Sequence, residues 1–329
     1  MRSWLSCRVA LTCVALICCG LIYGGQTCAT ALGEEDSPPE VERLKRQVAE
    51  LEEENRALRQ SLQHIRDALR NAELAAGDAR SKKLNLVITP GGWGSSQADV
   101  KAVCLSAASD LWKQFPDRKL HPIHIRYSTE GPMVEYRRGP AGEYRVLLNT
   151  KDQAWAQLAY QFAHEFCHVN CNYRKVPNPQ LWFEETLCET ASLFALRRMA
   201  ETWKTNPPYS NWKSYSNALN DYADKRIDQA KVPEDQTFLE WFKQHREDFR
   251  RSAVRRDLNS IVAGRILPLL EKDPSHWEAT RYLNLGDQRA NATFELYLND
   301  WWERSPEKHK KFIAELADLF GVPLIKDGR

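Results

Sequence analysis

The chain has no surplus of charge of either sign once its first segment is set aside. The 329 residues include 46 Lys and Arg against 44 Asp and Glu. Residues 1–31 hold two arginines and no acidic residue, so the remainder carries 44 of each kind. Binding to a phosphate backbone requires a basic surplus. Nucleic acid is therefore not an expected partner.

Two other signatures are also missing. The sequence has no internal repeat, which excludes solenoids and propellers. Its glycine-rich stretch, residues 90–96, does not end in Lys followed by Ser or Thr, so it is not a phosphate-binding loop. A turn is the better interpretation of that stretch.

Cysteine is scarce beyond residue 31, because five of the nine cysteines lie before it. The remaining four are Cys104, Cys167, Cys171 and Cys188. In an oxidising compartment they allow three full disulfide pairings, and buried free thiols are an equal alternative. Eleven tryptophans and 43% apolar residues supply a core without disulfides.

The first 31 residues have the three parts of a secretory signal. Arg2 and Arg8 precede an apolar run over 9–24, and Ala29-Thr30-Ala31 has the spacing of a cleavage site. We expect residues 1–31 to be a signal peptide and the protein to be secreted or periplasmic. The alternative is an uncleaved N-terminal segment that anchors the protein in a membrane.

An acidic, proline-containing linker, residues 32–40, precedes a heptad pattern that predicts a parallel coiled coil over 41–80. Asn55 is the one polar residue at the a positions. The a positions are Val41, Val48, Asn55, Leu62, Leu69 and Ala76, and the d positions are Leu44, Leu51, Leu58, Ile65 and Ala72. We expect a homodimer through residues 41–76. The alternatives are a single helix packed on the next domain, or a stalk.

Residues 82–329 read as one α+β domain, with a small N-terminal sheet followed by helices. Strands are expected over 84–89, 121–127 and 143–149, and a helix over 97–115. Thr150 and Gln153 suggest a capping box that opens the next helix. Further helices are expected over 181–202, 211–230, 236–250, 256–272 and 289–320. The sheet and the first site-bearing helix would occupy 82–175, and the helical part 176–329.

The strongest chemical signal is His164-Glu165-Phe166-Cys167-His168. Histidines four residues apart lie one turn above each other on one helix face, so both imidazoles can bind one metal ion. Glu165 is offset and can reach a water at the metal. A catalytic zinc site needs a third protein ligand and one open position.

A short loop later comes Trp182-Phe183-Glu184-Glu185. H-E-x-x-H followed by W-F-x-E on a second helix resembles the gluzincin zinc metallopeptidases over residues 143–200. The resemblance implies a zincin-like core in which His164, His168 and Glu185 hold a zinc ion (Zn2+). It also implies that Glu189 hydrogen-bonds one of the histidines. Thr186 and Cys188 depart from the family's commoner glycine and alanine.

Helix geometry also bears on which of the three glutamates is the third ligand. Glu185 and Glu189 are four residues apart and share a helix face, whereas Glu184 is rotated by about 100° with Leu187 and Cys188. Glu184 remains the second candidate for the ligand, and a helix surface charge is the alternative for Glu189. Cys167 could compete for zinc, face the core or pair with Cys188.

The implied activity is hydrolysis of a peptide or protein substrate, with Glu165 as general base. An oxyanion donor is expected downstream, and its candidates are Tyr209, Tyr215, Tyr222 and His245. By the same resemblance, strand 143–149 would be the sheet edge that pairs with substrate. The alternative is a catalytically inactive zincin-like domain that acts as a coiled-coil-dimerised binding or assembly module.

Overall fold

The computed structural model describes residues 39–75, 83–173, 175–286 and 289–324. The expected signal peptide and nearly all of the expected linker lie outside these residues. The chain divides into two compact units, residues 1–80 and 81–329, which are described separately. Within the described residues, every helix is too short or too polar to cross a membrane.

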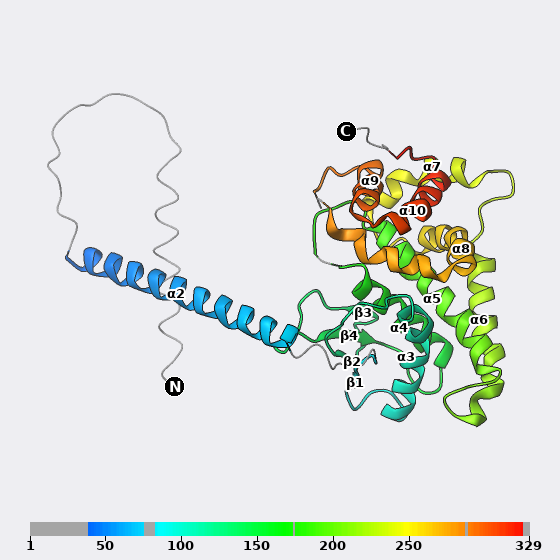
Figure 1. The fold of residues 1–329 in the computed structure, drawn as a ribbon, viewed down its shortest axis with the longest axis horizontal. Coiled ribbons are helices and arrows are strands. Elements are labelled where there is room, and N and C mark those ends of the chain that lie inside the picture. The colour runs from blue at the N-terminus through cyan, green and yellow to red at the C-terminus, as the bar shows by residue number, and fades with distance from the viewer. Residues whose placement is uncertain (1–38, 76–82, 174, 287–288, 325–329) are drawn as a thin grey trace. The chain divides into compact units, whose positions relative to one another are not determined.

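The first unit contains one long helix, α2 (Pro39–Ala75), shown in blue in Figure 1. It begins two residues before the expected coiled coil, with a proline in its first turn, where proline is well tolerated. The apolar heptad side chains are exposed, from 39% at Val41 to 61% at Leu58. Side chains are described only as far as residue 62, so Leu69 and Ala76 fall outside. The described part of α2 therefore carries an apolar stripe that the described residues of its own unit leave exposed.

The second unit begins with a four-stranded mixed sheet in the order β1-β2-β4-β3. Its strands are β1 (Leu86–Ile88), β2 (Ile123–Tyr127), β3 (Met133–Val134) and β4 (Tyr144–Leu148). The first three strands in that order are parallel, and β3 is antiparallel to β4. Alternate residues of β2, Ile123 and Ile125, are buried, as expected for a strand with one face on the core.

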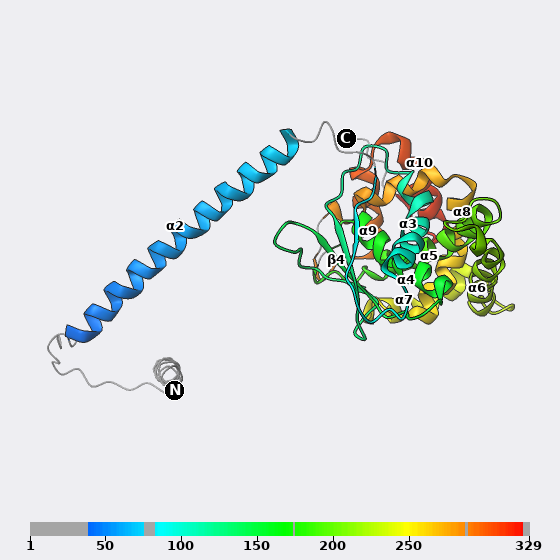
Figure 2. The ribbon, with the colours of Figure 1, turned by 90° about the horizontal axis from the view of Figure 1, so that it is seen from below.

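Two helices pack on this sheet, α3 (Gln97–Trp112) and α4 (Trp155–Asn170). The first has a capping side chain, because the Ser96 hydroxyl accepts a hydrogen bond from the Asp99 amide at 3.0 Å. Figure 2 shows the strands on one side of the unit and α6 on the other, with α4 and α5 between them. This arrangement places α4 between the sheet and the remaining helices.

Helix α5 (Trp182–Trp203) is the centre of the helical part, and packs against α3, α4, α6 and α8. Its first residue, Trp182, is buried among phenylalanine rings, the nearest being Phe249 at 4.3 Å between ring centroids. The remaining helices are η2 (Ser210–Tyr215), α6 (Ser216–Gln229), α7 (Phe238–Arg251), α8 (Arg256–Lys272), η3 (Pro274–Leu285), α9 (Phe294–Arg304) and α10 (Glu307–Leu319). The expected α+β class is confirmed.

Several local expectations were wrong. Helix α4 begins at Trp155 without a side-chain cap. The Thr150 hydroxyl instead donates a hydrogen bond to Gln161 Oε1 at 2.9 Å. The expected helix 289–320 is two helices, because Ser305 and Pro306 separate α9 from α10. Strand 143–149 is not a sheet edge, because the short strand β3, which the sequence did not reveal, pairs with its outer side.

Candidate metal centre

One face of α4 is polar in a helix that is otherwise buried. Gln157, Gln161, His164 and His168 follow the spacing of one helix face and line a cavity of about 520 Å3. The predicted apolar face, which includes Phe162 and Phe166, is fully buried. The core therefore fixes the rotation of α4 so that both imidazoles face the cavity, with ring centroids 5.0 Å apart.

Glu185, in the first turn of α5, lies against both histidines. One carboxylate oxygen is 3.2 Å from His164 Nε2 and the other is 3.6 Å from His168 Nε2. Burial raises the pKa of Glu185, but the charges and hydrogen bonds of the two histidines outweigh it and lower that pKa below the usual range. Glu185 is thus the carboxylate that faces the same ring nitrogen, Nε2, of both histidines.

Glu184 lies on the other side of His168, with its Oε1 2.6 Å from Nδ1. It is buried, and its Oε2 accepts a hydrogen bond from Asn284 Nδ2 at 2.6 Å. Burial raises the pKa of Glu184, and the contact with His168 opposes this rise. Glu184 therefore fixes the His168 ring with Nε2 directed toward Glu185. Glu184 was expected only as the second candidate for the ligand, and its contact with His168 was not predicted.

Glu189 is placed near the other histidine, one turn further along α5. Its Oε2 lies 4.0 Å from His164 Nδ1, which is too long for a hydrogen bond. Its Oε1 accepts hydrogen bonds from the Tyr160 hydroxyl and from the Ser260 hydroxyl. Glu189 is buried rather than a surface charge, and its present partners are hydroxyl groups.

Glu165 is 3% exposed and lines the same cavity. Burial raises the pKa of its carboxyl group, and His164 and His168 act in the opposite direction. A hydrogen bond links it to the backbone of Val134 in β3. The carboxylate is thus held between the histidine pair and the edge strand.

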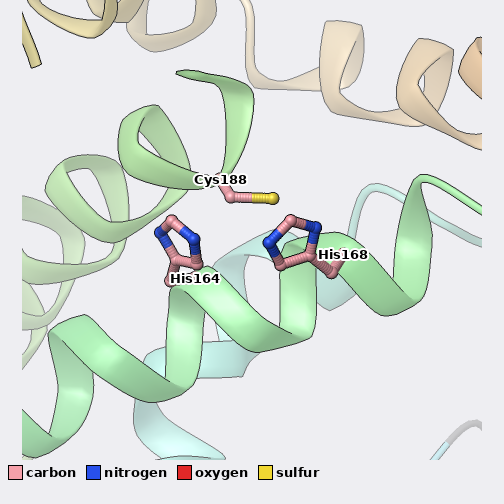
Figure 3. Close-up of side chains that lie close together, drawn as sticks. All are labelled: His164, His168 and Cys188. Carbon is pink, nitrogen blue, oxygen red and sulfur yellow. The ribbon is translucent and has the colours of Figure 1, made fainter. Parts of the chain in front are cut away.

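All four described cysteines are free and buried. The Sγ atoms of Cys167 and Cys171 are 3.8 Å apart, so the alternative of free thiols applies and the Cys167–Cys188 pair is not bonded. Figure 3 shows the Cys188 side chain directed from α5 toward the two imidazoles. One donor atom each from His164, His168 and Cys188 lie within 4.8 Å of one another. Burial raises the pKa of the Cys188 thiol well above its usual value.

The four candidate oxyanion donors differ in whether their side chains reach the cavity. Tyr222 lines the cavity. The Tyr215 hydroxyl forms hydrogen bonds with the backbone of residues 153 and 156. Tyr209 is 40% exposed and packs on Trp212. His245 lies on α7 with Asp248 3.1 Å from its Nδ1. The structure thus brings only Tyr222 of the four to the described site.

Other cavity residues were missed because no local pattern marks them. Tyr160 packs under Arg226, whose guanidinium carbon lies 4.5 Å from the ring centroid. Burial, followed by the charge of Glu189, raises the pKa of Tyr160 well above its usual value. Tyr136 and Arg256 also line the cavity. These residues are distant in sequence, so only the folded chain brings them together.

The donor set suits a zinc ion. The imidazoles of His164 and His168 and the carboxylate of Glu185 converge. In addition, His168 Nδ1 has the buried carboxylate of Glu184 as its partner, as is usual for a metal-bound histidine. The Cys188 thiol offers a second donor set that shares the same histidines. Glu185 lies 3.2 and 3.6 Å from their Nε2 atoms, which makes it the primary candidate for the third ligand.

Comparisons with protein-family models, with curated protein sequences and with solved structures find no match for this chain. The functional argument therefore depends on the residues and geometry of the site itself.

Proposed function

We propose that the chain is an exported zinc metallopeptidase with a zincin-like catalytic core, which hydrolyses peptide bonds. One observation carries the proposal: the carboxylate of Glu185 lies between His164 Nε2 and His168 Nε2, at 3.2 and 3.6 Å. Glu165 is buried in the same cavity. His164, His168 and Glu185 would hold the ion, and Glu184 would support His168 through its contact with Nδ1.

A bound zinc ion supplies a Lewis acid for the scissile carbonyl and lowers the pKa of a water molecule toward 7. The protein's part is then proton transfer and positioning. Glu165 accepts the proton of the attacking water on its carboxylate and passes it to the leaving amine. Its burial supports this role, because a raised pKa brings a carboxylate nearer to the basicity that proton transfer needs.

The edge strand supports binding of an extended substrate. Met133 and Val134 of β3 both line the cavity, and β3 is the last strand in the sheet order. A peptide can add to such an edge through main-chain hydrogen bonds. We therefore assign substrate pairing to β3 instead of to strand 143–149.

The test combines metal content with hydrolysis. Wild-type protein should contain one zinc ion per chain by elemental analysis, and His168→Ala should lose it. Glu165→Gln should keep zinc but hydrolyse an unfolded protein substrate about 100-fold more slowly, since its side chain cannot accept the proton. Glu201→Gln, on the exposed end of the same helix as Glu185, is the control and should resemble wild type. Full hydrolysis by Glu165→Gln would refute its role as the base.

Parallel pairing of α2 in a homodimer belongs to the same proposal. The exposed apolar stripe of α2 supports it, because leucine and valine at heptad positions are normally covered by a partner helix. Export remains part of the proposal, with the three-part composition of residues 1–31 as its support.

A further inference from the structure

Cys188 is a feature of the metal centre that the proposed peptidase chemistry does not use. It follows Glu185 by three residues on α5, the helix that packs against α4. Cys188 is 0% exposed, and its sulfur is directed toward the histidine pair (Figure 3). A donor atom from each of His164, His168 and Cys188 falls within a 4.8 Å cluster.

We propose that Cys188, as a thiolate, is a fourth protein ligand of the zinc ion, beside His164, His168 and Glu185. This inference rests on the proposed zinc site. Donors placed about 2.0–2.3 Å from a tetrahedral zinc ion lie roughly 3.3–3.8 Å from one another. The donor atoms of His164, His168 and Cys188 lie within 4.8 Å of one another, about 1 Å beyond that range. Glu185 is not part of that cluster and meets the histidines through its own contacts at 3.2 and 3.6 Å.

The chemistry of the thiol favours the same arrangement. A thiolate is one of the common zinc ligands, and a coordinated thiol is deprotonated by the ion. The Cys188 thiol is 0% exposed. Its other neighbours are the thiols of Cys167 and Cys171, which interact with it in the same buried cluster. Cys188 can therefore either ligate the ion or stay in the thiol cluster. The absorption spectrum of the bound metal distinguishes these two states.

Coordination by Cys188 has a consequence for activity. Structural zinc sites have four protein ligands, whereas catalytic sites keep one position open for water or substrate. A closed set of two histidines, Glu185 and Cys188 is a latent site. Hydrolysis then requires that the thiolate leave the ion, so removal of the thiol should increase turnover.

The experiment replaces zinc with Co(II) in the full-length protein and records its near-ultraviolet absorption, where thiolate-to-Co(II) charge transfer appears. The band should be present in wild type with one Co(II) per chain, and absent in Cys188→Ser. Cys104→Ser removes a buried thiol of α3 and is the matched control, which should keep the band. Cys167→Ser should keep it too, because the ligand is Cys188.

Zinc affinity and hydrolysis provide independent readouts. Cys188→Ser should bind zinc at least about tenfold more weakly, because loss of a direct ligand costs no less than loss of a residue that only orients one. It should also show a higher kcat/KM for peptide hydrolysis at saturating zinc. If the serine variant does not fold, as judged by circular dichroism, Cys188→Ala carries the same expectations.

The outcomes separate this inference from the proposed function. Stoichiometric Co(II) without the band in wild type, or a band that persists in both Cys188 variants, would overturn ligation by Cys188 and leave the peptidase proposal intact. A band that Cys188→Ser removes, with no hydrolysis in any variant, would support ligation and refute the peptidase. Absence of Co(II) binding to wild type would refute both.

Discussion

Glu184 Oε1 lies 2.6 Å from His168 Nδ1, so this buried carboxylate holds the imidazole on the side opposite its Nε2. The contact extends into the helical part of the domain. Asn284 Nδ2 donates to the other oxygen of Glu184 at 2.6 Å, and the Tyr297 hydroxyl donates to Asn284 Oδ1 at 2.7 Å. The orientation of one proposed zinc ligand thus depends on residues more than 100 positions further along the chain.

Glu184→Gln should weaken zinc binding by about 10- to 100-fold, because the amide is a poorer acceptor for the Nδ1 proton of His168. Competition with a chromogenic chelator measures the change. Tyr297→Phe removes only the outermost hydrogen bond and should have a smaller effect. Equal zinc affinities for wild type and Glu184→Gln would contradict the orienting role.

Tyr222→Phe should lower kcat by about 100-fold if its hydroxyl stabilises the developing oxyanion, with zinc content unchanged. Tyr222 is the cavity-lining member of the four candidates. Tyr209→Phe is the matched control, because Tyr209 is 40% exposed and packs on Trp212. Steady-state kinetics on a peptide substrate measures kcat for both variants. Equal kcat values would show that the Tyr222 hydroxyl does not stabilise the oxyanion.

Leu51→Lys should convert the expected dimer to a monomer, because it places a charge at a d position that is 57% exposed in the single chain. Light scattering gives the mass directly. Glu50→Lys changes a neighbouring exposed position outside the heptad core and should stay dimeric. A wild-type mass equal to that of one chain would rule out pairing through residues 41–76.

Trp182→Ala should lower the free energy of unfolding by about 3–5 kcal/mol, because it leaves a cavity among buried aromatic rings. Trp182 is 1% exposed, and its ring centroid lies 4.3 Å from that of Phe249 and 4.8 Å from that of Phe294. Denaturant unfolding measures the loss. Leu296→Ala, at a position 51% exposed, should cost less than about 0.5 kcal/mol.

The pattern of α4 was predictable because it is local. Phe162 and Phe166 repeat with helical spacing and are buried, and this repeat alone places His164 and His168 on the opposite, cavity-facing side. The long helix over the heptads and the order of sheet before helices follow from periodicity in the same way. Helix ends were less predictable, since Thr150 found Gln161 as a partner instead of capping α4.

Short elements and partners distant in sequence were not predictable, because no local pattern in the sequence marks them. Strand β3 has only two residues, so it has no period to detect, and its pairing with β4 depends on a loop that returns it to the sheet. Glu184 was expected to point about 100° away from Glu185 around the helix axis. The packing of α5 on α4 instead lets both glutamates reach His168, through different ring nitrogens.

The sequence by itself determined the class of fold, the spacing of His164 and His168 and the candidates for their partners, because helical periodicity and residue chemistry are properties of neighbouring positions. Only the tertiary structure decided that Glu185 faces both Nε2 atoms, that Glu184 contacts His168 Nδ1, and that Cys188 lies near the histidine pair. Those relationships depend on how α4 and α5 pack, and packing is fixed by core contacts between residues far apart in the chain.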